Sequence, residues 1–215
     1  MIRIESKDIL GEKKSNPVVA FYAAGIGVMF LLFTATGASG ALLEEQESGT
    51  LDRVLSTHVS MTTLLAGKLL YLATLAMSQL ILMFTWGAIM FGVELREHLA
   101  GFTIMAIVTS LAASSFGIFM ATMCRTRGQL SALSTLLVLI ISAVGGSMIP
   151  RFMMPESIQK FSFIFFNSWA LEGFLKVFWR EEPLRNLVPE VSVLLGTTLV
   201  FMLLARRFAA RWDIT

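Results

Sequence analysis

The chain has 215 residues, of which 55% are hydrophobic and 15% are charged, and its formal net charge is +2. Soluble domains carry about 25% charged residues, so this composition excludes an ordinary soluble protein, which would have to bury several wholly apolar helices in one small core. The single cysteine excludes a disulfide within the chain, and the small net charge gives no reason to expect nucleic acid as a partner.

Long gaps between charged residues predict the membrane spans. A helix needs roughly 20 apolar residues to cross a bilayer. Four charge-free stretches reach that length, and a fifth stretch, with Glu190 as its one charged residue, approaches it: 17–43, 69–93, 99–124, 128–150 and 187–205. The sequence therefore predicts an all-α integral membrane protein whose membrane domain covers residues 17–215 and crosses the bilayer with five transmembrane helices.

The connector between the first two spans, residues 44–68, is acidic and has a helical pattern. Leu51, Val54 and Leu55 recur at positions i, i+3 and i+4, which gives a short helix one small apolar face. Thr50 is expected to cap that helix. A short helix of this kind is typical of a docking element, and the alternative is an idle solvated loop.

A second helix is predicted to follow after a break at Thr57–His58. Ser60 is expected to cap it at its N-terminus. The helix then enters the bilayer past Lys68, whose long side chain can reach the membrane edge.

Small and polar residues within the spans have two interpretations. Small residues four apart allow close packing of membrane helices, and they could also line a substrate path; in the third span they are Thr109, Ala113, Gly117 and Ala121. Gln79, near the centre of the second span, is a candidate for hydrogen bonding between helices or for lining a path.

The segment 157–180 before the last span is amphipathic but too interrupted to cross a membrane. Ser168, Glu172, Lys176 and Arg180 recur every four residues, which predicts one wet helix face and a helical ion pair between Glu172 and Lys176. The segment is expected to re-enter the membrane or to lie at its interface, and the alternative is an ordinary surface helix. Glu172 and Lys176 are further candidates to line a path.

No motif in the sequence predicts catalysis. A phosphate-binding glycine loop is missing, and no nucleophile, base and acid are spaced as a catalytic set. His58 and His98 have no cysteine or histidine at ligand spacing, so no metal site is expected. The four longest spans contain no ionisable residue, which disfavours an intramembrane enzyme or a proton relay.

The stretch LLEEQESGTLDRVLSTHVSMTTLLAGKLL (42–70) resembles the first cytoplasmic loop of ABC type-2 (ABC-2) exporter permeases. An acidic cluster, Gly-Thr-Leu, a later leucine and Gly-Lys carry the likeness, through Glu45, Glu47, Gly49, Thr50, Leu51, Leu55, Thr57, Gly67 and Lys68. His58 stands where the family commonly has proline, and the usual arginine of the acidic cluster is missing. PRFMMPESIQKFSFIFFNSWALEGFLKVFWREE (150–182) and the ending LLARRFAARW (203–212) are also similar.

The resemblance implies a permease subunit of an ATP-driven exporter in the bacterial inner membrane. Residues 44–68 then form the coupling loop, which contacts a separate ATP-binding subunit that carries ATP and magnesium; the expected contacts are Glu45, Glu47, Gly49, Thr50, Leu51, Val54 and Leu55. A second permease copy is the other expected protein partner. Many family members have six spans, so the five-span chain is similar to the C-terminal part, with residues 1–16 as the tail of an extracellular domain.

Two questions stay open at this stage. The family places residues 44–68 inside the cell, which leaves 7 of the 17 Lys and Arg residues inside and 10 outside, against the positive-inside rule; we follow the resemblance. A membrane scaffold without transport activity, or a degenerate or truncated permease, is the alternative function. The sequence does not indicate the substrate.

Overall fold

The structure, a computed structural model, describes residues 17–57, 59–149 and 153–212. The predicted tail 1–16 and His58 lie outside these residues. The described chain contains helices and no strand: α1 (Pro17–Ser39), α2 (Ala41–Glu47), α3 (Thr50–Leu55), α4 (Met61–Phe91), α5 (Leu99–Met123), α6 (Arg127–Val144), α7 (Glu156–Ser162), α8 (Phe166–Phe178), α9 (Val188–Ala209) and the 3₁₀ turns η2 (Leu184–Leu187) and η3 (Ala210–Trp212).

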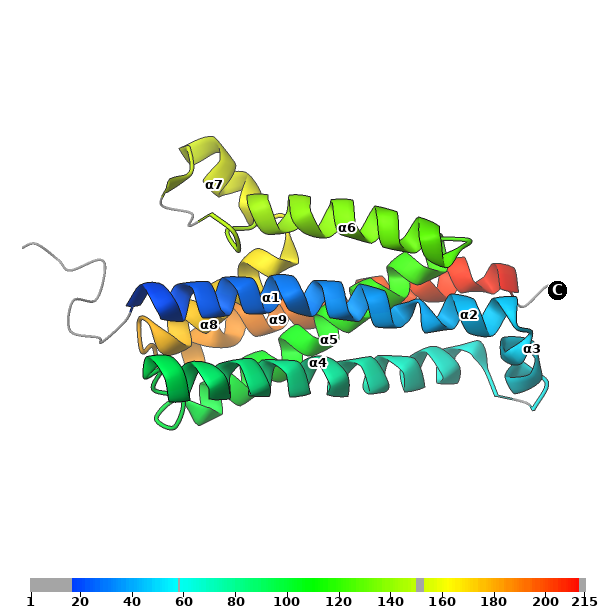
Figure 1. Cartoon of the computed structure of the whole chain (residues 1–215), viewed down its shortest axis with the longest axis horizontal. Coiled ribbons are helices and arrows are strands. Elements are labelled where there is room, and N and C mark those ends of the chain that lie inside the picture. Colours follow the sequence, from blue (N-terminus) through cyan, green and yellow to red (C-terminus); the bar gives the residue numbers. More distant parts are fainter. Residues whose placement is uncertain (1–16, 58, 150–152, 213–215) are drawn as a thin grey trace, which may run out of the picture.

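Five segments of the described chain are long and apolar enough to cross a membrane. The prediction of an all-α protein with five membrane spans is therefore confirmed. Three spans are single helices, one is formed by α1 together with α2, and one by η2 together with α9. Figure 1 shows these spans running side by side along the long axis of the molecule.

Helix α5 is the centre of the bundle. It packs against α1, α4, α8 and α9. In its most apolar 18-residue stretch, 78% is buried, compared with 17–28% in the corresponding stretches of the spans that contain α4, α6 and α9. Its four predicted packing residues, Thr109, Ala113, Gly117 and Ala121, are all buried. A Cβ atom at Gly117 would lie 2.5 Å from the backbone oxygen of Ala35 on α1, so the two helix backbones approach closely at this point.

Two helices have other boundaries than the apolar stretches that predict the spans, because a local cap or turn determines where these helices begin or end. The predicted cap at Ser60 is confirmed, because its hydroxyl accepts a hydrogen bond from the Thr63 amide (3.2 Å). Helix α4 therefore begins at Met61, before the apolar stretch that starts at residue 69. Helix α6 ends at Val144 rather than residue 150, in a turn whose Gly146 has a positive φ of 93°.

The predicted amphipathic segment 157–180 consists of two helices, α7 and α8. Helix α8 folds back onto the bundle and packs against α1, α5 and α9 (Figure 1). The expectation of a wet face is wrong, because only Arg180 of its four polar residues is exposed. Ser168 is fully buried, and its hydroxyl lies 2.6 Å from the carbonyl oxygen of Ser162 and 3.0 Å from that of Gly145.

The predicted ion pair between Glu172 and Lys176 is also replaced. Glu172 pairs with Arg180, and Lys176 Nζ lies 2.9 Å from the Glu190 carboxylate on α9. Lys176 also donates a hydrogen bond to the carbonyl oxygen of Asn186. The reason is the packing of α8 against α9. The Glu190 carboxylate on α9 is buried, and a buried charge is strongly unfavourable without a partner of opposite charge. Lys176 therefore pairs with Glu190 and not with Glu172 on its own helix.

Candidate interaction site at the end of the bundle

The α2–α3 turn lies at one end of the bundle (Figure 1) and is fixed by its backbone. Gly49 has φ 69° and ψ 8°, a left-handed conformation that glycine adopts without strain. The amide of Ser48 donates to the carbonyl of Glu44 (2.9 Å) and that of Gly49 to the carbonyl of Gln46 (3.1 Å). Gly49 is the N-cap residue of α3, so the prediction that Thr50 caps this helix is wrong: Thr50 is its first residue.

The predicted apolar face of α3 is divided between the protein interior and its surface. Leu51 is 1% exposed and belongs to the core of the chain itself. Leu55 is half-buried against that core, whereas Val54 is 38% exposed. Leu51 therefore anchors α3 to the bundle, and Val54 is the most exposed apolar side chain of the three.

Two ion pairs hold α2 against neighbouring spans. Glu45 pairs with Lys68 on α4, and Glu44 pairs with Arg127 at the start of α6. Lys68, predicted to extend to the membrane edge, is thus engaged within the protein. Glu47 is exposed and has no ion-pair partner among the described residues, so its carboxylate is available to a partner.

A groove of about 750 Å³ lies beside α3. Its walls come from α3, from the connection to α4 and from the C-terminal end of α9 with η3, and they include Asp52, Leu55, Ser60, Arg206 and Trp212. Sequence reasoning did not assign Arg206 or Trp212 to this site. Both residues belong to the ending LLARRFAARW (203–212), which resembles the family. The position of this ending beside α3 depends on how α9 packs, so the sequence alone does not assign it to the groove.

Comparison with known proteins identifies the family. The family model described as "ABC-2 family transporter protein" matches residues 2–207, nearly the whole chain. The chain belongs to the ABC-2 transporter family. The sequence-based recognition of an ABC-2 protein is therefore confirmed.

Two relatives of this ABC-2 chain carry permease names. The linearmycin resistance permease protein LnrN of Bacillus subtilis is 24% identical over 197 residues, which cover 89% of this chain and 50% of LnrN. The inner membrane transport permease YhhJ of Escherichia coli is 28% identical over 134 residues, 61% of this chain and 35% of YhhJ. The chain thus spans half or less of the length of these relatives. No solved structure matches it.

The candidate path residues of this ABC-2 protein occupy two places. Gln79 lies within α4, and its side-chain oxygen is buried without a hydrogen-bond partner among the described residues. Glu172 and Lys176 lie on α8, and each is engaged in an ion pair. Lys176 and Glu190 are only 15% and 3% exposed, so this pair connects two elements and is not open to solvent.

Proposed function

We propose that the chain is the permease subunit of an ATP-driven exporter and that its α2–α3 end docks on a separate ATP-binding subunit. The observation that carries this proposal is the partial exposure of the α2–α3 end: Val54 on α3 and Glu47 on α2 are exposed, while Leu51 holds α3 to the core. The likeness of residues 42–70 to the coupling loop of ABC-2 permeases and the permease names of two relatives support it.

The attachment of α3 suits it to transmit a conformational change. On one side α2 continues the line of α1, and on the other side Ser60 caps α4 only five residues after α3 ends. The pair between Glu45 and Lys68 joins these two sides. A displacement of α3 by a docked ATPase therefore moves the ends of two spans together. ATP binding can then bias the permease between two states, because the docked contacts differ between them.

The proposal places the remaining components outside this chain. ATP and magnesium belong to the ATP-binding subunit, and a second permease copy completes the path across the inner membrane. The α2–α3 end faces the cytoplasm. The name of LnrN refers to linearmycin resistance in that protein.

The test replaces Val54 with aspartate and measures co-purification with the cognate ATPase. An unpaired carboxylate in a desolvated contact costs more than about 1.4 kcal/mol, so the retained ATPase should fall at least tenfold. Leu51→Asp is a poor substitute, because Leu51 is buried and its replacement would unfold α3. Ile158→Asp is the matched control, since Ile158 is 42% exposed on α7 at the opposite end.

Three results distinguish the proposal from its alternative. Loss of ATPase binding in Val54→Asp, with wild-type binding in Ile158→Asp and unchanged thermal stability in both, supports docking at α3. Wild-type binding and transport in Val54→Asp would contradict it. If the ATPase binds neither the wild type nor any variant, a membrane scaffold without transport activity becomes the better interpretation of this protein.

A further inference from the structure

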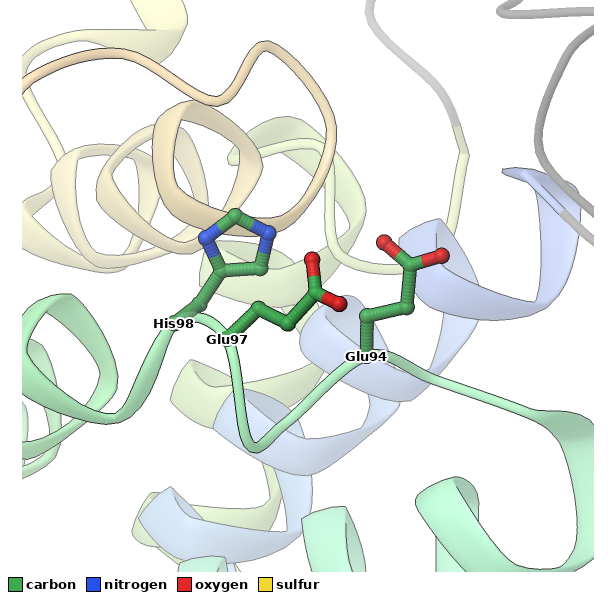
Figure 2. Close-up of side chains that lie close together, drawn as sticks. All are labelled: Glu94, Glu97 and His98. Carbon is green, nitrogen blue, oxygen red and sulfur yellow. The ribbon is translucent and has the colours of Figure 1, made fainter.

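A cluster of metal-ligating side chains lies in the turn between α4 and α5, at the end of the bundle opposite α3. Glu94, Glu97 and His98 each offer one ligand atom, and these three atoms all lie within 4.8 Å of one another (Figure 2). The proposed docking at α3 uses none of them.

The backbone of the turn brings the three side chains together. Gly92 ends α4 with a positive φ of 70°. The amide of Leu95 then donates to the carbonyl of Val93 (2.7 Å), and the amide of His98 donates to that of Leu95 (3.3 Å). These bonds close a compact loop, so that residues 94, 97 and 98 present their side chains to one small region (Figure 2).

The imidazole of His98 is held in place but has an unused nitrogen. Its ring packs edge-on against Phe178 of α8, with ring centroids 5.9 Å apart and an interplanar angle of 81°. His98 is the N-cap residue of α5, but its side chain makes no capping hydrogen bond. Its Nε2 atom is buried and has no hydrogen-bond partner in the described chain. Leaving such an atom unpaired is unfavourable, so it lacks a ligand or a proton acceptor.

The surroundings of the cluster favour a cation. Figure 2 shows a ring nitrogen of His98 directed toward the side of the turn that carries the Glu97 carboxylate. Neither Glu94 nor Glu97 has an ion-pair partner among the described residues. A pocket of about 280 Å³ adjoins Glu97 and His98, and Glu182 also lines it. Two carboxylates thus lie close to one imidazole, beside space for a small ligand.

We propose that Glu94, Glu97 and His98 bind a divalent transition-metal ion of the zinc type. Three protein ligands that combine imidazole and carboxylate, with water in the remaining position, are typical of accessible zinc sites. The imidazole favours zinc over magnesium or calcium, which prefer all-oxygen ligands. Because the His98 ring contacts Phe178, a bound ion fixes the α4–α5 turn relative to α8. In the orientation proposed above, this face lies outside the cytoplasm.

The test titrates the full chain with zinc chloride. The protein is purified in detergent without a polyhistidine tag and stripped with a chelator. We expect one zinc ion per chain by equilibrium dialysis and a higher melting temperature with zinc, because a ligand that binds only the folded state stabilises it. Glu94→Gln and Glu97→Gln should each weaken binding at least tenfold and abolish the shift in melting temperature. Both glutamates are exposed, so both variants should fold.

Matched controls separate this site from unspecific binding. Glu156→Gln removes an exposed carboxylate from α7 and should leave zinc binding unchanged. Cobalt in place of zinc should give an absorption band that the His98→Asn variant lacks. Magnesium should not raise the melting temperature. The proposal is overturned if zinc does not saturate at one per chain, if Glu97→Gln binds it as the wild type does, or if magnesium stabilises equally.

Discussion

At the scale of single residues, the shape of the interaction site depends on one backbone conformation. Gly49 has a φ of 69°, and a Cβ atom there would have no neighbour within 4 Å. Side-chain space is therefore not the constraint. The left-handed conformation itself is the constraint, because it costs other residues roughly 1–2 kcal/mol.

We predict that Gly49→Ala lowers the free energy of unfolding by about 1 kcal/mol and reduces ATPase binding. Gly49→Asn should cost less, since asparagine tolerates this region better. Gly67→Ala is the control: Gly67 lies within α4 and also has open space around it, so alanine should be neutral or stabilising there. Thermal melting in detergent measures the difference, and equal melting temperatures for Gly49→Ala and Gly67→Ala would refute the argument.

At the scale of elements, polar contacts decide how α8 sits in the bundle. Asn167, at its start, is fully buried, and its amide donates to the Ile141 carbonyl (3.1 Å) and to the Ser147 hydroxyl (3.2 Å). Near its end, Lys176 pairs with Glu190 of α9. These contacts fix α8 to α6 and α9, and they explain why its polar face turns inward.

The Lys176–Glu190 pair gives a prediction about coupling between elements. Removing one partner leaves a buried charge uncompensated, so Lys176→Met or Glu190→Leu alone should destabilise, Lys176→Met by about 3–5 kcal/mol. The double variant Lys176→Met with Glu190→Leu should regain most of that loss, because it leaves no buried charge. Melting temperatures of the three variants provide the double-mutant comparison. A double variant no more stable than Lys176→Met would mean that the pair is not an energetic unit.

At the scale of the whole molecule, the five spans separate two functional ends. The α2–α3 connector and the end of α9 lie at one end, whereas the α4–α5 turn and α8 lie at the other (Figure 1). The proposed ATPase contact and the proposed metal site are thus on opposite sides of the membrane.

Cysteine labelling of intact cells tests this orientation. Cys124 is buried and is first replaced with alanine to remove background. Cysteines introduced at the exposed positions Arg96 and Arg125 should then react differently. An impermeant thiol reagent should label position 96 and not position 125. The reverse pattern would favour the count of positive charges over the family orientation.

The sequence by itself determined the properties that depend on neighbouring residues. Apolar runs of sufficient length specified five spans. Ser60 marked the start of α4, because its hydroxyl accepts a hydrogen bond from an amide only three residues later. The motif of residues 42–70 indicated the family. These signals are local, because helix length, capping and hydropathy are set within one turn or one run of chain.

Only the tertiary structure decided which side chains are available for function. Leu51 carries the same helical pattern as Val54, yet packing against the bundle buries the first and exposes the second. The pairs Glu44–Arg127 and Lys176–Glu190 join residues far apart in the chain. A buried charge or apolar side chain takes whichever partner the packed helices bring near, and no spacing along a single helix contains that information.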